Sequence, residues 1–310
     1  MSLTTSPLTI DHAGEWASLR RRINEVSGLL WKPTEQEMVE ALAPSSTFDP
    51  ARQTWGRWSG GSLVAFATVA VRDHPRHDGI NAADIDSGVH PDLRGRGISS
   101  ALLELAEPVA IELATARLPA VPLVLTAVAS STDQPSIDLL VDHDYSAVRY
   151  FFEMSHDLSG EASEDSRTRE FTPADSEATR LAHNDAFRTH WGSGPASAEK
   201  WNQFMTSAGF RPDLSRIVER DGEVLAYGMV SSTVPGEAYL ELVGTRAAAQ
   251  GNGLGRAVLN SVVAAVRAAG GFTTLGLDVD ADNPSGAGKF YGSAGFVNAA
   301  RTITYEKPAR

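Results

Sequence analysis

Two stretches of the chain carry apolar residues at the three- and four-residue spacing of an amphipathic helix. They are Trp16, Leu19, Ile23 and Val26 in the first half, and Ala178, Leu181, Ala182 and Phe187 in the second. An apolar run follows each stretch, at 62–71 and 223–231, and a Gly-Gly or Asp-Gly pair of the kind found in tight hairpin turns precedes each run. The pattern predicts a helix and then a β-hairpin in each half.

The rest of each half again shows one order of elements. A strand leads into clustered glycines, a helix follows, and a further strand (121–128 or 273–279) precedes a short helix. The helix after the second glycine cluster has one broad apolar stripe, made of Leu254, Val258, Leu259, Val262, Val263 and Val266. We therefore predict an α/β fold with a mixed sheet (α+β mixed) in each half.

The two halves also repeat each other in sequence. Residues 89–103 align without gaps with residues 245–259, an offset of 156 in a chain of 310 residues. A repeat of this period is too long for a solenoid and indicates a duplicated domain. The stretch 157–169 between the halves is small and charged, as in a linker. We predict domains at 1–157 and 169–310 with a linker at 158–168.

Composition narrows the class of protein. With 42% apolar and 21% charged residues, the chain has the profile of an ordinary globular protein. It has no cysteine, which excludes disulfides, zinc sites built on thiolates and thiol chemistry. Its net charge of −12 disfavours nucleic acid as a partner. No apolar run is long enough for a membrane span and no signal sequence is evident, so we expect a cytoplasmic location.

The glycine clusters predict an anion site, because backbone amides at a helix start are unpaired and glycine lets a phosphate approach them. The dinucleotide fingerprint fails, since Ser100 and Arg256 stand where its last glycine belongs. A P-loop at Gly288-Lys289 fails as well, because its upstream glycine position holds Asn283. The pattern Gln/Arg-x-x-Gly-x-Gly/Ala does fit. The second half matches it fully with Gln250, Gly253 and Gly255. The first half matches it with Arg94 and Gly97 and has Ser99 at the last position.

This pattern resembles the pyrophosphate loop of GNAT-type N-acetyltransferases. The stretch 280–296 is similar to the closing motif of that family, with Asn283 after a strand, Tyr291 on the next helix and Gly295-Phe296 behind it. The resemblance covers most of 170–308, and in 1–157 it rests on the loop 94–99 and the repeat. The layout is similar to the mycothiol synthase group. It implies two tandem GNAT acyl-CoA N-acyltransferase domains that use acetyl-CoA as co-substrate, no metal, and direct transfer to an amine.

The resemblance also implies site residues. Tyr291 stands where the family has the acid that protonates the leaving thiolate, and packing beside two phenylalanines is its alternative role. Glu241, four residues before Thr245, is the candidate base, directly or through water, and a solvated strand carboxylate is the alternative. The family implies a bulge near 243–245 in this strand, whose alternation places Leu240 and Leu242 on the face opposite Glu241. Asn283 orients pantetheine or merely caps a helix.

The implied contacts of CoA and acceptor form three sets. In the second half, CoA is expected on Val243, Thr245, Gln250, Gly251, Asn252, Gly253, Leu254, Gly255, Arg256 and Asn283. In the first half, it is expected on Val89, Arg94, Gly95, Arg96, Gly97 and Ser99, where a purely structural turn is the alternative. The acceptor amine is expected near His190, Trp191 and Tyr239, although aromatic residues there are as often core.

The first half lacks the candidate proton-transfer groups. The positions corresponding to the base and to Tyr239 hold Ile85 and Ala83, and Leu140 corresponds to Tyr291. We therefore expect a catalytically silent first domain that binds CoA or walls the second site. The second domain is expected to acetylate a primary amine of a small molecule, because an acidic chain attracts cationic amines. The protein is expected to be a monomer or a homodimer. A mycothiol synthase proper and a non-catalytic acyl-CoA-binding module are the alternatives.

Overall fold

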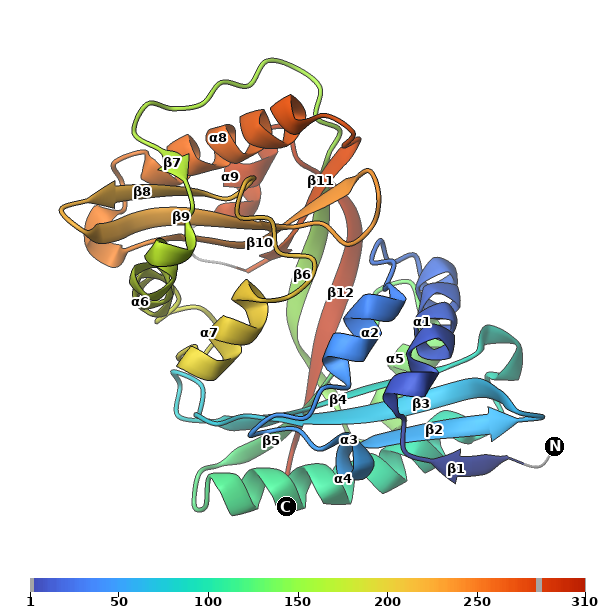
Figure 1. Cartoon of the computed structure of the whole chain (residues 1–310). Helices are drawn as coiled ribbons and strands as arrows, with labels where there is room; N and C mark the ends of the chain where they lie inside the picture. The colour runs from blue at the N-terminus through green and yellow to red at the C-terminus, as the bar shows by residue number, and fades with distance from the viewer. Residues whose placement is uncertain (1–2, 283–285, 310) are drawn as a thin grey trace. The chain divides into compact units, whose positions relative to one another are not determined.

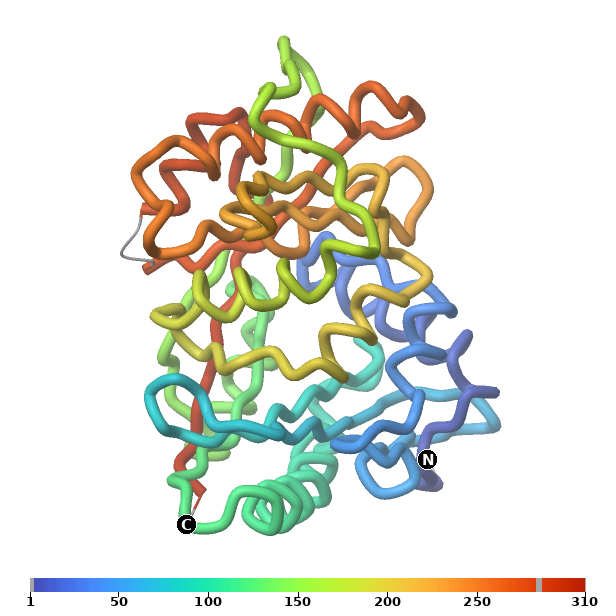
Figure 2. Tube along the Cα trace, turned by 60° about the vertical axis from the view of Figure 1, so that its left-hand side comes forward, coloured from blue at the N-terminus to red at the C-terminus, as the bar shows by residue number. Residues whose placement is uncertain are grey.

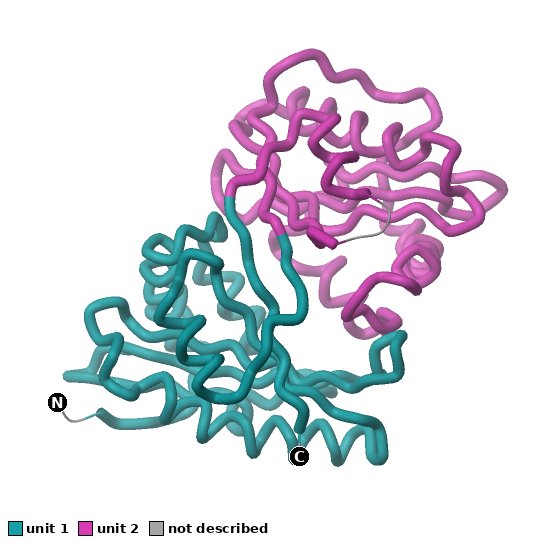
Figure 3. Tube along the Cα trace, turned by 180° about the vertical axis from the view of Figure 1, so that it is seen from behind, with its two compact units in different colours: residues 1–151, 300–310 teal, residues 152–299 magenta. Residues whose placement is uncertain are grey.

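The computed structural model describes residues 3–282 and 286–309. The chain forms two compact units, unit 1 with Met1–Phe151 and Ala300–Arg310, and unit 2 with Phe152–Ala299 (Figure 3). The predicted boundaries assigned 300–310 to the second domain, whereas these residues belong to unit 1. Each unit is an α/β structure with a mixed sheet, as the periodicity predicts.

Unit 1 begins with a helical layer and a strand meander. Its helices are α1 (Ala13–Ser27), α2 (Glu35–Ala41), α3 (Pro50–Gln53), α4 (Ile98–Arg117) and α5 (Gln134–Asp142). Its strands are β1 (Thr4–Ser6), β2 (Thr54–Ser59), β3 (Ser62–Val71), β4 (Asn81–Val89), β5 (Leu123–Ser130), the start of β6 (Ser146–His156) and most of β12 (Val297–Pro308). The hairpin of β2 and β3 lies where the Gly-Gly pair predicts it.

In the sheet of unit 1, the strands β1 to β5 lie in chain order and β12 follows β5. Strand β4 runs parallel to β5, and the other pairs described here are antiparallel. Helix α4 covers one face, and α1 and α2 cover the other (Figure 1). Alternation along β3 serves both layers, because Ala65 and Ala67 pack under α4 while Phe66 packs against Trp16 of α1.

The end of the chain completes this sheet. Strand β12 pairs antiparallel with β5 from Thr302 opposite Ser130 to Pro308 opposite Val124 (Figure 2). Ile303 and Tyr305 of β12 are buried in the core under α4. Arg76, buried in unit 1, donates to Glu306 of β12 at 2.5 Å. The C-terminal strand is therefore a core element of the unit formed mostly by the first half.

Unit 2 repeats the arrangement. Its strands are the end of β6, β7 (Arg169–Glu170), β8 (Arg216–Arg220), β9 (Glu223–Ser231), β10 (Glu237–Thr245) and β11 (Thr274–Asp280), and its helices are α6 (Ser176–Ala186), α7 (Ala198–Met205), α8 (Leu254–Ala269) and α9 (Ala287–Gly292). The sheet order is β6-β11-β10-β9-β8-β7, with β10 and β11 parallel. Helix α8 covers one face with its apolar stripe, and α6 covers the other (Figure 1).

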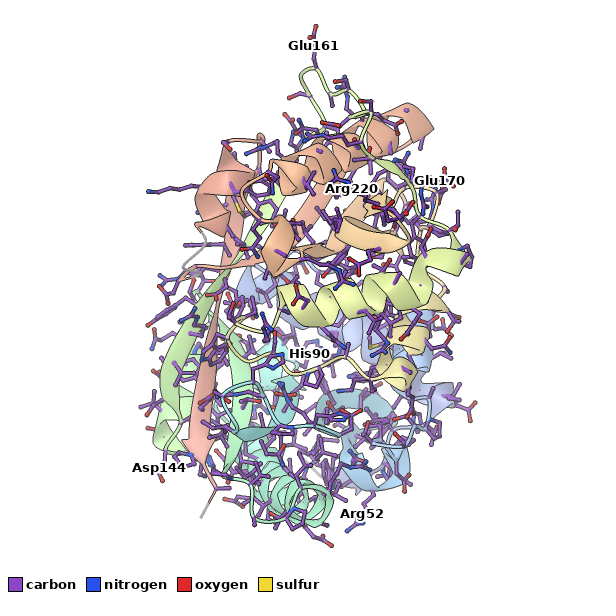
Figure 4. The ribbon with its side chains drawn as sticks, turned by 90° about the vertical axis from the view of Figure 1, so that its left-hand side faces the viewer. Arg52, His90, Asp144, Glu161, Glu170 and Arg220 are labelled. Atoms are coloured by element: carbon purple, nitrogen blue, oxygen red, sulfur yellow. The ribbon has the colours of Figure 1, made fainter. Side chains whose placement is uncertain are left out.

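The predicted linker is attached to unit 2. Leu158 is buried in the core under α8, although the composition of this stretch suggested little to bury. The backbone N–H of Asp165 donates to Ser261 Oγ of α8 at 2.8 Å, and the Thr168 hydroxyl lies 2.8 Å from the same oxygen. Glu161 lies at the outer end of the segment (Figure 4). Only part of the segment is therefore exposed.

Candidate functional site

The two glycine loops have the same backbone shape. Each begins with a short 3₁₀ turn, Pro91–Leu93 or Ala247–Ala249, and ends at the N-terminus of a long helix, α4 or α8. The φ angles are +72° and +73° at Gly95 and Gly97, and +77° and +71° at Gly251 and Gly253. Residues with a side chain rarely adopt this backbone conformation, so glycine is strongly favoured at these four positions. The amides of the first helical turn have no partner within the helix and can bind an anion.

Next to each loop, two parallel strands separate. Strands β10 and β11 pair only from Glu237 opposite Thr274 to Tyr239 opposite Gly276, and both then continue unpaired with each other, to Thr245 and Asp280. Strands β4 and β5 pair only up to Asp84 opposite Thr126 and continue in the same way. The backbone between separated strands is available to a ligand that lies between them. The place where the two strands separate beside the glycine loop is called the cleft of each unit below.

The other predicted contacts of the second loop lie around this cleft. A Cβ atom on Gly255 of α8 would lie only 3.2 Å from Thr245 Oγ1 at the end of β10, so this strand and this helix approach each other closely here. Gln250 donates to the Thr245 carbonyl at 3.2 Å, and Asn252 donates to the Ala249 carbonyl at 3.2 Å. Val243 and Leu254 pack in the core under α8. Asn283 lies outside the described residues.

Arg256 connects the loop to α9. Its guanidinium donates to the Phe290 carbonyl at 2.9 Å and to Ser293 Oγ, and it lies 4.4 Å from the centroid of the Phe290 ring. The side chain is therefore committed to positioning the helix that carries Tyr291. Its predicted role as a direct CoA contact stays a prediction.

A bulge in β10 redirects the side chains of this strand. The register against β9 shifts between Leu240 and Leu242, which leaves Glu241 as the extra residue. Leu240 packs under α8, whereas Leu242 packs against the opposite, α6-side core. The expectation that Leu240 and Leu242 share a face is therefore wrong. The bulge expected near 243–245 lies a few residues earlier, at Glu241. A one-residue bulge reverses the alternation, and bulges are frequent beside active sites.

Glu241 lines a cavity of about 210 Å³ on the α6 side of unit 2. Its lining residues are His183, Ala196, Lys200, Trp201, Phe204, Glu241 and Leu242. Glu241 accepts a hydrogen bond from the Ser231 hydroxyl of β9. The cavity thus combines an acidic group with an aromatic wall, as a site for a cationic amine requires.

Tyr291 lies on α9 between two aromatic rings. Its ring centroid is 5.1 Å from that of Phe290 and 5.9 Å from that of Phe296. Burial raises the pKa of the Tyr291 phenol to about 12. The hydroxyl is therefore protonated throughout the neutral range and can act as a proton donor.

A partly buried histidine–tyrosine pair lies between the cavity and β10. His183 Nδ1 lies 2.8 Å from the hydroxyl of Tyr227, which is fully buried. A Cβ on Gly244 would collide with this hydroxyl, so glycine is required there for close approach. Burial lowers the pKa of His183 to about 4, with His190 contributing, and raises that of Tyr227, with Tyr291 contributing. The sequence analysis missed both residues, although His183 and Phe187 have helical i, i+4 spacing.

The residues predicted to bind the acceptor, His190, Trp191 and Tyr239, do not line this cavity. His190 bonds Ser193 through Nδ1 at 2.9 Å, and neither it nor Trp191 belongs to the cavity lining. Tyr239 packs over β11, where a Cβ on Gly276 would lie 2.8 Å from its ring. Its hydroxyl is hydrogen-bonded to Asp278, and burial raises the pKa of both groups. Among the described residues, the cavity is therefore formed by α6, α7 and β10 instead.

Unit 1 has its own cavity, of about 320 Å³, in the corresponding cleft. The loop residues Arg94, Gly95, Gly97 and Ser99 line it together with Val89, and Arg96 is not in this lining. Ile85 and Leu140 line it at the positions that correspond to Glu241 and Tyr291. Strand β4 pairs with β3 without a register shift, so the bulge of β10 has no counterpart.

Arg94 is engaged within unit 1. Its two terminal nitrogens each lie 2.9 Å from an oxygen of Asp133, which is buried and also accepts from the Ser27 hydroxyl at 2.6 Å. Bidentate pairs of this kind fix the orientation of the guanidinium. The leading loop residue of unit 1 therefore anchors α5, whose N-cap is Asp133.

Neither a helix that could span a membrane nor a cluster of metal ligands is found among the described residues, 3–282 and 286–309. In this part of the chain, no helix is both long and apolar enough to cross a membrane. No three His, Asp or Glu side chains in the same ranges are placed to hold a metal ion. In the described part of the chain, the titratable groups that line the two cavities are carboxylates, one imidazole, the Lys200 ammonium and the Arg94 guanidinium.

Comparisons with known proteins agree with this geometry. The model of the Acetyltransferase (GNAT) family matches residues 16–140 and 177–296, more than half of the chain. The mycothiol acetyltransferase of Streptomyces bingchenggensis (strain BCW-1) is 34% identical over 142 residues, which are 44% of this chain and 44% of that protein. The chain thus matches less than half the length of this relative.

Solved structures share the fold of the whole chain. A GCN5-related N-acetyltransferase from Sphaerobacter thermophilus superposes with a TM-score of 0.76 at 22% identity, over 99% of this chain and 95% of that one. A tandem GNAT protein from the clavulanic acid biosynthesis pathway superposes with a TM-score of 0.75 at 20% identity, over 100% and 99%. The predicted tandem GNAT architecture is confirmed.

Proposed function

Because the chain belongs to the GNAT acetyltransferase family, we propose that unit 2 transfers the acetyl group of acetyl-CoA to the primary amine of a small molecule. The observation that carries this proposal is the junction of cleft and cavity at β10. This strand leaves β11 after Tyr239, bulges at Glu241 and leads into the anion loop at Thr245. One strand thereby serves both the cofactor cleft and the acceptor cavity.

The residues of the second loop suit a CoA pyrophosphate. The left-handed glycines Gly251 and Gly253 remove side chains from the approach, and the start of α8 supplies amides and the positive end of its dipole. Bound there, acetyl-CoA supplies an activated thioester. The unpaired edge of β10 between Glu241 and Thr245 offers the backbone groups that fix an extended pantetheine arm.

Glu241 is proposed as the base, directly or through water. A carboxylate in the cavity binds the incoming ammonium and takes one proton from it, which frees the nitrogen lone pair. The nitrogen then forms a bond with the acetyl carbon as the carbon–sulfur bond breaks, and it loses its second proton to solvent to give the neutral amide. The electron pair of the broken bond leaves on sulfur.

Tyr291 is proposed as the acid that receives this charge. Its hydroxyl donates a proton to the departing thiolate and later recovers one from solvent. The raised pKa keeps the phenol protonated, so a hydrogen bond to sulfur is available while negative charge develops. Packing between Phe290 and Phe296 holds the ring in one orientation.

Unit 1 is proposed to bind CoA without turnover. Its cleft, loop and cavity have the corresponding shape, whereas Ile85 and Leu140 cannot transfer protons. The engagement of Arg94 by Asp133 leaves the loop amides as the main phosphate ligands.

A second candidate substrate follows from the similarity to the mycothiol acetyltransferase of Streptomyces bingchenggensis. The acceptor in that case is the amine of desacetyl-mycothiol. The two candidates share the chemistry and the proposed proton-transfer residues, and differ only in which amine fills the cavity.

One assay tests the proposal. The purified chain is mixed with acetyl-CoA and a panel of primary amines that includes desacetyl-mycothiol, and thiol release is followed. We expect amine-dependent release that falls at least tenfold in Tyr291→Phe. Efficient acetylation of desacetyl-mycothiol alone would favour the second candidate, and binding of acetyl-CoA without release for any amine would leave only a binding module.

A further inference from the structure

The cavity beside Glu241 has an aromatic and apolar wall. Trp201 and Phe204 of α7, Leu242 of β10 and Ala196 of the loop before α7 form this wall. Trp201 is only 5% exposed. A wall of this kind selects a ligand with an apolar or aromatic body, because flat rings gain contact area and lose little conformational freedom.

Hydrogen bonds from α6 fix this wall in place. Asn184 Oδ1 accepts from the Ala196 N–H at 2.7 Å, and Arg180 donates to the Ala196 carbonyl at 2.9 Å. The indole N–H of Trp201 donates to Ser176 Oγ at 3.1 Å. The loop before α7 and the ring of Trp201 are therefore held before a ligand arrives, which lowers the entropy cost of binding.

Two opposite charges border the wall. Glu241 is the acidic member, and Lys200 of α7 is the basic one. Lys200 is exposed, and no carboxylate of the described residues lies within ion-pair distance of its Nζ. The third polar lining group, His183, is engaged by Tyr227 through Nδ1 and is neutral at pH 7 because burial lowers its pKa to about 4. Among the described residues that line this cavity, Lys200 is therefore the cation available to a ligand.

We propose that the acceptor is an amino acid-like zwitterion with an apolar or aromatic body, whose ammonium faces Glu241 and whose carboxylate faces Lys200. The inference rests on the proposed acetyl transfer and adds the class of acceptor. An amine without an anionic group leaves Lys200 unused and loses one charge-assisted contact. A cavity of about 210 Å³ accommodates a body of the size of one large side chain.

The test compares L-phenylalanine with phenethylamine, which lacks only the carboxylate. For the wild-type chain we expect kcat/KM with L-phenylalanine to exceed that with phenethylamine at least tenfold. Lys200→Gln should lower the value for L-phenylalanine about tenfold and leave that for phenethylamine within twofold. The matched control is Arg220→Gln, which removes one positive charge on β8 (Figure 4), outside the cavity lining, and should change neither value.

Binding is read separately from turnover, by quenching of tryptophan fluorescence with L-phenylalanine. We expect saturable quenching that weakens in Lys200→Gln but not in Arg220→Gln. Equal kcat/KM for the two amines, or an equal loss for both in Lys200→Gln, overturns the zwitterion and leaves the acetyltransferase proposal intact. Absence of turnover with every amine overturns the proposed function and this inference with it.

Discussion

His183 on α6 and Tyr227 on β9 form a partly buried hydrogen bond in unit 2, with 2.8 Å between Nδ1 and the hydroxyl oxygen. The pair links the cavity on the α6 side, which His183 lines, to Gly244 of β10, over which the Tyr227 hydroxyl lies. His183 also stacks on Phe187 with 4.4 Å between ring centroids. The imidazole is thus fixed in position and held neutral by burial.

This burial predicts a dependence of stability on pH. His183 has a pKa of about 4 in the folded chain and one near 6.5 when unfolded. Above pH 6.5 the imidazole is neutral in both states, whereas between about 6.5 and 4 the unfolded state binds a proton that the folded state does not. The free energy of unfolding should therefore decrease as the pH falls through this window, by about 3 kcal/mol in total. Urea unfolding of the wild type and of His183→Gln at several pH values measures it, and equal slopes would contradict it.

Gly244→Ala should be strongly destabilising. The new methyl group would meet the hydroxyl end of Tyr227, which is fully buried and cannot move away. Overpacking of this kind costs about 1 to 3 kcal/mol or more. Gly288→Ala is the control, because a Cβ at Gly288 on α9 meets nothing within 4 Å. Thermal unfolding should show a lower Tm for the first variant only, and a wild-type Tm for Gly244→Ala would refute the close approach.

Glu241→Gln tests the base. An amide cannot accept the proton of the ammonium, so kcat/KM at neutral pH should fall roughly 10²-fold. The loss should shrink as the pH rises toward the amine's own pKa of about 10 because solvent then deprotonates the acceptor. Initial rates of thiol release across this range measure the effect. Glu237→Gln, at the start of the same strand, should retain wild-type rates, and a pH-independent defect in Glu241→Gln would point to binding alone.

The Tyr291 phenol should titrate with a pKa of about 12, about two units above an ordinary tyrosine. Tyrosinate absorbance is recorded for the wild type and for Tyr291→Phe as the pH rises. The difference between the two curves should remain near zero around pH 10 and grow only above about pH 11. An absorbance difference that already develops at pH 10 would show that the pKa of Tyr291 is not raised, contrary to the burial of this side chain in the structure.

The unequal units predict two CoA sites per chain and one site of turnover. Gly97→Val places a side chain at a φ of +73° and closes the approach to the first loop. Calorimetry should then count one CoA per chain instead of two, with kcat unchanged. Gly253→Val should abolish turnover and keep the first site. A similar partial loss of turnover in both variants, to about half, would mean that the two units are catalytically equivalent.

Much of this fold follows from local patterns in the sequence. The predicted runs 62–71 and 223–231 coincide with β3 and β9, because a tight-turn pair before an apolar run fixes where a strand begins. The glycine loops were also predictable. Left-handed φ angles, as at Gly95, Gly97, Gly251 and Gly253, strongly favour glycine, so clustered glycines indicate this conformation.

Pairings between distant segments needed the tertiary structure. The bulge at Glu241 leaves no trace in the strand's composition, yet it reverses the alternation and moves Leu242 to the other face. His183 and Tyr227 are 44 residues apart, and only the packing of α6 on β9 brings them together. Likewise, residues 302–308 pair with β5 of unit 1. Turn chemistry and periodicity are set by neighbouring residues, whereas register and strand partners depend on which edges the folded units present.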